Sequence, residues 1–490
     1  MSETAFPQRR SGSARSDAEG PAALPRRITA RAAVIVTAVL LTALTAVVAA
    51  TVRTGDDGAH LGRLLTGYGV AWVLFAVAAW AVRRAPRRAA TALVLAGSAA
   101  VAVAALAAPP RTSTDMFRYA WDGRVQAAGI SPYAHPPAAP QLDRLRDEWL
   151  FPGKGDCRGW GLTRTDHGRC TRINRPGVPT IYPPVAEGWF FAVHLLSPPD
   201  SRHKPFQVGG AVLAVGTTAA LLAVGRRRGD PDRAAGRAAL WGWCPAVPIE
   251  AVDNAHVDTL GVLLTVLALG TATAGARRGA LLGAAVAVKL LPVLALPGAL
   301  SGVRSPARVA RVAVALLAAV ALVYLPYVAA SGVGVLGYLP GYLQEEGYSP
   351  DDVHRFALVR LVLPDSAAEV TVVVLLALTA LYVLRRGDPA RPWRGALLLI
   401  GTALLLMSPN FPWYALLVVG LVALDGRWEW LTVPLAGTVL YLCGPRLHGV
   451  PVQAWSYGAA AACVVVGAVL RAEPARRFLG RCTGAFRAST

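Results

Sequence analysis

Apolar blocks of roughly 15–22 residues recur along this chain of 490 residues. A helix of that length crosses the roughly 30 Å hydrocarbon core of a membrane. The blocks are rich in Ala, Val and Leu with scattered Gly, which favours helices over the strands of a barrel. Charged residues make up only 16% of the chain, far fewer than a soluble protein of this length carries. The sequence therefore predicts an all-α integral membrane protein, a polytopic helical bundle.

The blocks predict about twelve transmembrane helices. They lie at 32–52, 64–82, 89–108, 207–225, 238–252, 257–274, 309–330, 366–384, 395–408, 411–425, 430–443 and 452–471. Two more apolar pieces, 183–197 and 279–300, would spoil the alternation of loop charges if they crossed completely, so we expect re-entrant or interfacial helices there. The second piece is interrupted at Pro292, because proline removes a helical hydrogen bond.

Arginines cluster in short pieces between the apolar blocks, and the net charge is +20. These pieces are 83–88, 226–233, 277–278 and 385–394. Loops rich in Lys and Arg face the cytoplasm, so the pattern indicates a multi-pass plasma-membrane protein with both termini inside, and it argues against a nucleic-acid partner. Two segments long enough for chemistry, about 109–182 and 331–365, are then extracytoplasmic.

Three parts follow from this layout. Residues 1–31 are polar, Arg-rich and lack a small-residue cleavage site, so we expect a disordered cytoplasmic tail and not a removed signal peptide. Residues 32–471 form the membrane domain, which includes the extracytoplasmic loop 109–182. Residues 472–490 form a second cytoplasmic tail.

Two of the six cysteines, Cys157 and Cys170, lie in the long outward loop. A disulfide persists outside the cytoplasmic membrane, and closing a loop of this size is worth roughly 3 kcal/mol. We favour a Cys157–Cys170 bridge. The alternatives are two unpaired thiols, or metal ligands together with His167, although four well-spaced ligands are not evident.

The outward loop opens with DMFRYAWDGRVQAAGISPY, which begins at Asp115. If residues 115–128 are helical, Asp115, Tyr119 and Asp122 share one face. Met116, Phe117 and Trp121 lie mostly off that face, where they are suited to the membrane interface, and Gly129 ends the helix. The alternative is a solvated helix that carries an Arg118–Asp122 ion pair.

This stretch resembles the first-loop signature of GT-C membrane glycosyltransferases, in particular actinobacterial polyprenol-phosphate-mannose-dependent alpha-1,6-mannosyltransferases and glycosyltransferase family 87. Similar motifs follow in order as IYPPVAEGWF (181–190), DNAHVDTLGVLL (253–264), the Lys-Leu-Leu-Pro that begins at Lys289, and SPNFPWYALL (408–417). The family often has His-Asn-Asp where this chain has His256, Val257 and Asp258, so an amide role at the middle position is in doubt.

The resemblance implies sugar transfer on the outer face of the membrane. The donor would be a polyprenyl-phosphate sugar, most simply mannose, and the acceptor a hydroxyl on a glycolipid or cell-envelope glycan. Asp115 would be the general base of an inverting reaction, because a sugar hydroxyl attacks faster when a carboxylate accepts its proton. Asp122 is the second candidate, as base or as orienter of the acceptor.

Other polar residues are candidates for the donor phosphate or the sugar. Lys289 lies inside an apolar block and needs an anionic partner, which is a lipid phosphate or an acid unless the side chain reaches the interface. His256, Asp258 and Arg355 are further phosphate candidates, although an arginine in an outward loop is more often a surface residue. Candidates for the sugar or acceptor are Arg118, Tyr119, Tyr182, Asn410 and Trp413, of which the aromatic ones also fit an interfacial belt.

No Asp-x-Asp pair of the nucleotide-sugar type stands out in the sequence, and the motifs HExxH and CxxCH are absent, so no metal or organic cofactor is indicated. The alternative function is a transporter or flippase of lipid-linked sugars. It is disfavoured because no inverted repeat relates the two halves of the chain.

Overall fold

The structure is a computed structural model that describes residues 23–54, 57–153, 155–166, 168–343, 355–447 and 451–487. The rest of the predicted tails, residues 1–22 and 488–490, lies outside the described residues, as does His167. The regular secondary structure of the described chain is almost entirely helical, with one short hairpin.

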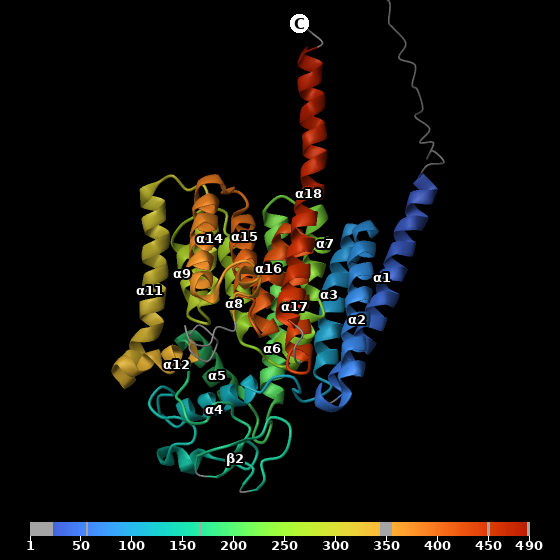
Figure 1. Cartoon of the computed structure of the whole chain (residues 1–490). Coiled ribbons are helices and arrows are strands. Elements are labelled where there is room, and N and C mark those ends of the chain that lie inside the picture. Colours follow the sequence, from blue (N-terminus) through green and yellow to red (C-terminus); the bar gives the residue numbers. More distant parts are fainter. Residues whose placement is uncertain are drawn as a thin grey trace, which may run out of the picture.

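A bundle of helices forms the body of the protein (Figure 1). Its longer helices are α1 (Ala23–Val52), α2 (Asp57–Ala81), α3 (Arg87–Ala105), α6 (Lys204–Arg227), α7 (Pro231–Gly242), α8 (Asp258–Gly270), α9 (Ala276–Val286), α11 (Pro306–Ser331), α14 (Asp365–Arg386), α15 (Pro392–Met407), α16 (Leu416–Asp425), α17 (Thr432–Cys443) and α18 (Val452–Arg487). Short helical turns join them: η1 (Val82–Arg84), η3 (Val247–Asp253, a π-helix), η4 (Leu291–Ala295), α10 (Leu296–Ala299), η5 (Gly332–Leu336), α12 (Leu339–Leu343), α13 (Ala357–Arg360), η7 (Pro412–Ala415) and η8 (Trp428–Leu431).

Seven described helical segments are long and apolar enough to cross a membrane. They are Thr29–Val52, His60–Arg84, Arg87–Ala105, Lys204–Arg227, Pro306–Leu336, Asp365–Arg386 and Val452–Ala472. The pair η3 and α8, bent by 117°, would make an eighth. These segments agree with the predicted all-α membrane protein, but they do not confirm about twelve crossings. Several predicted crossings form shorter helices: the 16 residues of α15 span only about 24 Å at 1.5 Å per residue.

The arginine-rich connections gather at one end of the bundle, where α1 begins and α18 ends (Figure 1). Arg228 donates to the carbonyl of Ala272 at 3.1 Å and also to that of Ala390, and so joins three of these connections. The segment 109–182 lies at the opposite end, where it forms a lobe beside the bundle. The bundle therefore has one arginine-rich end and one end that carries the lobe.

The lobe contains α4 (Asp115–Ala127), η2 (Pro140–Leu145) and an antiparallel hairpin of β1 (Thr163–Arg164) and β2 (Cys170–Thr171), and it leads into α5 (Pro184–Leu196). Cys157 and Cys170 form a disulfide that closes this hairpin region. As predicted, α4 ends before Gly129, whose φ of +75° suits glycine. The Ile130 amide then bonds back to the carbonyl of Val125 at 3.2 Å and caps the helix.

The aromatic residues of α4 do not lie on the membrane interface as predicted. Met116, Phe117 and Trp121 are 0%, 5% and 1% exposed. Trp121 packs edge-on against Phe151 at 5.1 Å, and Phe117 packs against Trp149 at 5.8 Å. The prediction was wrong because the rest of the lobe folds over this face of α4 and supplies it with a hydrophobic core.

Candidate functional site

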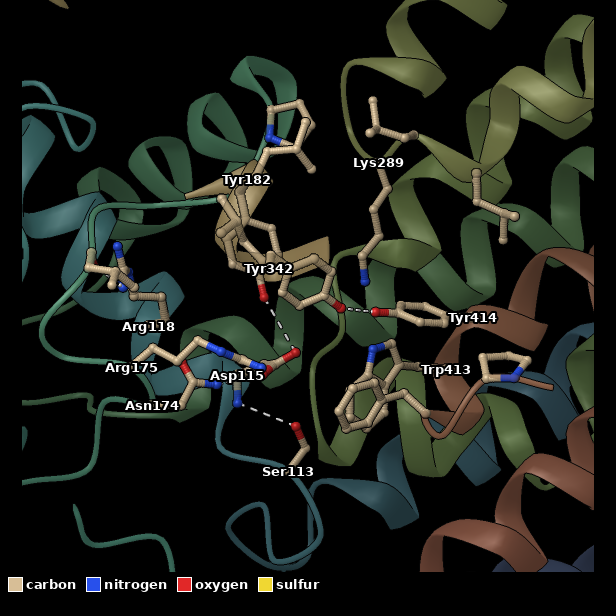
Figure 2. A pocket seen from close by; sticks show the side chains of 18 of the residues that line it. Ser113, Asp115, Arg118, Asn174, Arg175, Tyr182, Lys289, Tyr342, Trp413 and Tyr414 are labelled. Carbon is tan, nitrogen blue, oxygen red and sulfur yellow. Dashed lines mark hydrogen bonds between the residues drawn. The ribbon is translucent and has the colours of Figure 1, made fainter. Parts of the chain in front are cut away.

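A cavity of about 560 Å³ lies where the lobe meets the bundle. Its lobe side is formed by the start of α4 and by the segments 174–175 and 178–183. Its bundle side is formed by residues that follow α9, by α11 and α12, and by the broken region between α15 and α16. Figure 2 shows the polar side chains of both sides directed into the same space.

Asp115 is the first residue of α4 and lines the cavity. Its Oδ1 accepts a hydrogen bond from Asn174 Nδ2 at 2.7 Å, and its Oδ2 accepts one from the Tyr182 hydroxyl at 3.3 Å. The positive end of a helix dipole favours a carboxylate at this position. A carboxylate has about four acceptor positions, so two donors fix its orientation and still leave capacity for a substrate hydroxyl.

His256 lies behind Asp115 and does not itself line the cavity. The ring is 1% exposed and stacks on Trp413, with ring centroids 4.0 Å apart. Nδ1 is 3.0 Å from the carbonyl of Glu250, which can only accept, so Nδ1 carries the proton in that bond. Nε2 is then free to accept from Ser113 Oγ at 3.0 Å, and it lies 3.9 Å from Asp115 Oδ2. The histidine thus supports the start of α4 from within the bundle.

Lys289 enters the cavity from the bundle side, in the break between α9 and η4. Its ammonium donates to Asp258 Oδ2 at 2.7 Å and lies 4.8 Å from the centre of the Tyr414 ring. An ammonium has three donors, so this ion pair leaves two for a ligand in the cavity. Of the alternatives that the sequence left open, the structure contains the pairing with an acid.

The charges that line the cavity are mostly positive. Arg355 is 1% exposed and lies in the cavity wall. An arginine in an outward loop was expected to lie on the protein surface instead. Arg175 lies over the ring of Tyr342 at 5.3 Å. Of the described residues that line the cavity, four are Lys or Arg and one, Asp115, is a carboxylate. Such a wall suits an anionic ligand.

Asp122 does not line the cavity. It is 1% exposed, and its two carboxylate oxygens accept from Arg118 Nε at 3.0 and 2.9 Å. The Arg118–Asp122 pair of the alternative interpretation is therefore present, but it is buried and not solvated. Tyr119, 0% exposed, stacks on Phe190 at 4.3 Å and is likewise absent from the lining. Asp115, Tyr119 and Asp122 were predicted to share one helical face. Of the three, Asp115 lines the cavity, whereas Tyr119 and Asp122 are buried elsewhere.

The remaining candidates divide in the same way. Arg118, Tyr182 and Trp413 line the cavity, whereas Asn410 does not. The Oδ1 atom of Asn410 is 3.5 Å from Gln453 Nε2, which places the amide against α18. The disulfide of Cys157 and Cys170 is also outside the cavity wall.

Sequence reasoning missed several residues at this site. Asn174 and Glu250 carry no spacing signal, because each reaches the site through a loop or an irregular turn. Tyr342 was also missed, and its hydroxyl is hydrogen-bonded across the cavity to that of Tyr414, which adjoins the predicted Trp413 (Figure 2). Glu187 did have a signal: it is an acid in an otherwise apolar helix.

No cluster of three or more His, Cys, Asp or Glu that could hold a metal ion occurs in the part of the chain that the structure describes. The arrangement therefore offers one oriented carboxylate, a set of cations and an apolar wall. These are parts suited to proton transfer beside an anionic group.

Residues 181–409 match the family model of glycosyltransferase family 87. The match supports a GT-C-like, family 87 glycosyltransferase. It confirms the resemblance that the sequence motifs indicated. No curated protein and no solved structure gives a significant match. The matched region includes His256, Asp258 and Lys289, and it begins after Asp115 and α4.

Proposed function

We propose that this membrane glycosyltransferase moves a sugar, most simply mannose, from a polyprenyl-phosphate donor to a hydroxyl of a glycolipid or cell-envelope glycan. The preference for mannose comes from the motifs that resemble polyprenol-phosphate-mannose-dependent enzymes. The observation that carries the proposal is the cavity, in which the carboxylate of Asp115 and the ammonium of Lys289 are directed into one space from different walls (Figure 2).

The walls suit both halves of such a donor. Leu290, Leu291, Val293 and Leu294 form an apolar side of the cavity, and Leu290 and Val293 are 47% and 43% exposed. These side chains are apolar, so an isoprenoid chain can lie against them without leaving an apolar environment. The cationic lining compensates the charge of the phosphate, which also disfavours a neutral donor.

In the proposed reaction Asp115 accepts the proton of the acceptor hydroxyl as its oxygen attacks the anomeric carbon. The bond between that carbon and the donor phosphate oxygen breaks, and polyprenyl phosphate leaves with the electron pair. The attack occurs opposite the leaving group, so the configuration inverts. The negative charge that develops on the phosphate is stabilised by Lys289, with Arg355 as a further cation in the wall. Proton transfer to a positioned carboxylate contributes about 10²–10⁴-fold.

The position of the site favours the extracytoplasmic face of the plasma membrane. The cavity adjoins the lobe, at the end of the bundle opposite the arginine-rich connections. Because such connections stay in the cytoplasm, the lobe is outside and both termini are inside. A lipid-linked donor fits that location, whereas a cytoplasmic nucleotide sugar would not reach it.

The test is transfer by the purified protein in nanodiscs, supplied with radiolabelled polyprenyl-phosphate mannose and a glycolipid acceptor. We expect labelled glycolipid from the wild type and at least about 10²-fold less from Asp115→Asn. Asp166→Asn, an exposed acid of the same lobe, is the matched control and should retain activity. Movement of label between leaflets without a new glycosidic bond would instead indicate a transporter.

A further inference from the structure

A fully buried acid, Glu187, lies on α5 behind the lobe side of the cavity. It is 0% exposed. Its Oε1 accepts from Thr180 Oγ1 at 2.7 Å, and its Oε2 accepts from Gln126 Nε2 at 2.9 Å. Its carboxyl group also lies close enough to that of Asp122 for each to influence the pKa of the other. Two carboxyl groups thus meet in a place without solvent.

Only one of these two carboxyl groups has a positive partner. Arg118 uses its Nε on both oxygens of Asp122 and its Nη1 on the carbonyl of Val178 at 3.2 Å. A second buried negative charge beside Asp122 would be uncompensated, which is costly. Burial, and then the charge of Asp122, raise the pKa of Glu187 well above its usual value. Burial without a cation of its own thus favours the neutral form of Glu187 over the ionised form.

The hydrogen bonds lead from Glu187 to the reactive carboxylate. Thr180, held by Glu187, accepts the main-chain N–H of Tyr182 on its Oγ1 at 3.2 Å. The hydroxyl of Tyr182 then donates to Asp115 Oδ2. Arg118 holds the same segment from the other side through Val178. Residues 178–182 therefore form a short segment of the cavity wall. Arg118 and Glu187 hold this segment in place, and its Tyr182 hydroxyl donates to Asp115.

We infer that Glu187 is a positioning residue for transfer: in its neutral form it fixes Thr180, and through the segment 178–182 it sets the Tyr182 hydroxyl against Asp115. This inference rests on the proposed role of Asp115 as the base. When Glu187 loses its proton, it repels Asp122 and the segment loses its support. A displacement of about 1 Å at a reacting group can lower the rate about 10²-fold. A change at Glu187 can therefore lower the rate of transfer, even though Glu187 does not line the cavity.

An ionised Glu187 would interact with the charged and titratable groups that surround it. From α4 these are Arg118 and Asp122, from the lobe Tyr133, and from α11 Tyr327, whose hydroxyl donates to Gln126 at 2.8 Å. Among the strongest influences on the pKa of Glu187 in the described part of the chain, Arg118 is the one cation. An ionised Glu187 would therefore share a single positive charge with Asp122.

The proposal predicts a specific pH dependence of kcat. As the pH rises through the raised pKa of Glu187, wild-type kcat should fall. Glu187→Gln cannot ionise, and its amide oxygen can still accept from Thr180, although its amide nitrogen cannot accept the bond that Gln126 Nε2 donates to Glu187 Oε2. This variant should keep neutral-pH kcat within about threefold of the wild type and lose the alkaline decline. Glu187→Ala and Thr180→Val should lower kcat about tenfold or more at every pH, with the donor KM little changed.

An infrared measurement separates this inference from the proposed function. The protonated carboxyl of Glu187 should give a C=O stretching band at pH 7 that is missing in Glu187→Gln. If the band is found but the wild type transfers no sugar, the proposed function is wrong, whereas the protonated state of Glu187 is confirmed. If the band is missing, or if Glu187→Gln and the wild type share one alkaline pH profile, the inference is overturned. The inference is also overturned if Thr180→Val folds and has the same kcat as the wild type. This test does not require that Glu187→Ala folds.

Discussion

The Tyr182 hydroxyl donates to Oδ2 of Asp115 at 3.3 Å, although 67 positions separate the two residues. The bond joins the start of α4 to the segment that leads into α5, on one wall of the cavity. Asn174 holds the other carboxylate oxygen. Asp115 is thus oriented by two donors that come from parts of the lobe distant in sequence.

Tyr182→Phe should therefore lower kcat about tenfold while leaving the fold intact. A hydrogen bond to a charged group contributes about 1.5–3 kcal/mol, and the carboxylate keeps its second donor, Asn174. Steady-state transfer kinetics would measure the effect, with Tyr382→Phe on the exposed face of α14 as the control. An unchanged kcat would show that Asn174 alone orients the base.

Lys289→Met should raise the donor KM at least about tenfold and also lower kcat, because the cation compensates both the bound and the leaving phosphate. The substitution leaves Asp258 without its partner at 2.7 Å, which by itself destabilises the protein. The double variant with Asp258→Asn removes that second effect. We expect it to recover thermal stability but not transfer; recovery of both would exclude Lys289 from the donor site.

Gly123→Ala should destabilise the contact between α4 and α5. A Cβ at this position would lie 2.5 Å from the main-chain oxygen of Phe190, and overpacking of this kind costs about 1–3 kcal/mol. Gly188 is the matched control, since a Cβ there meets nothing within 4 Å and alanine is the better helix former. Thermal unfolding in detergent should rank Gly123→Ala below the wild type and Gly188→Ala at or above it.

Reduction of the Cys157–Cys170 disulfide should loosen the hairpin region of the lobe without abolishing transfer. The two cysteines are 13 positions apart, and a loop of that order contributes about 3 kcal/mol to stability. Neither sulfur lines the cavity. Limited proteolysis with and without reductant should show faster cleavage near residues 155–170 at similar turnover, and resistance equal to that of the oxidised protein would contradict the prediction.

His203 should make stability depend on pH below neutrality. Burial first, and then Lys204 and Arg202, lower the pKa of this histidine to about 4 from 6.5. Its Nε2 has no hydrogen-bond partner among the described residues. The unfolded chain binds the proton more readily, so the stability contribution is present above pH 6.5 and is lost as the pH falls through about 4. His203→Gln should show a smaller fall in melting temperature over that window than the wild type.

The periodic parts of the fold were predictable from local patterns. Gly129 marks the end of α4, Pro292 lies in the interrupted region after α9, and the predicted piece 183–197 corresponds to α5. Each of these depends on backbone chemistry or on an apolar run, which a sequence displays directly. The count of crossings was less predictable, because short helices such as α15 and α16 are apolar but lie inside the bundle.

The candidate site was predictable only in part. Asp115, Lys289, Tyr182 and Trp413 line one cavity as a group, even though no spacing rule relates them. Asp122 shares a helix with Asp115 but faces a buried neighbour, Glu187, that the helical pattern could not supply. A helical wheel shows which residues share a face, but it does not show what covers that face.

The sequence by itself indicated a helical membrane protein that resembles glycosyltransferases, because apolar length, arginine placement and motif order are properties of the linear chain. Only the tertiary structure decided which acid is oriented in a cavity and which is neutralised in the interior. The reason is physical: the state of a carboxyl group depends on the donors, charges and solvent around it, and the chain brings those together only by folding.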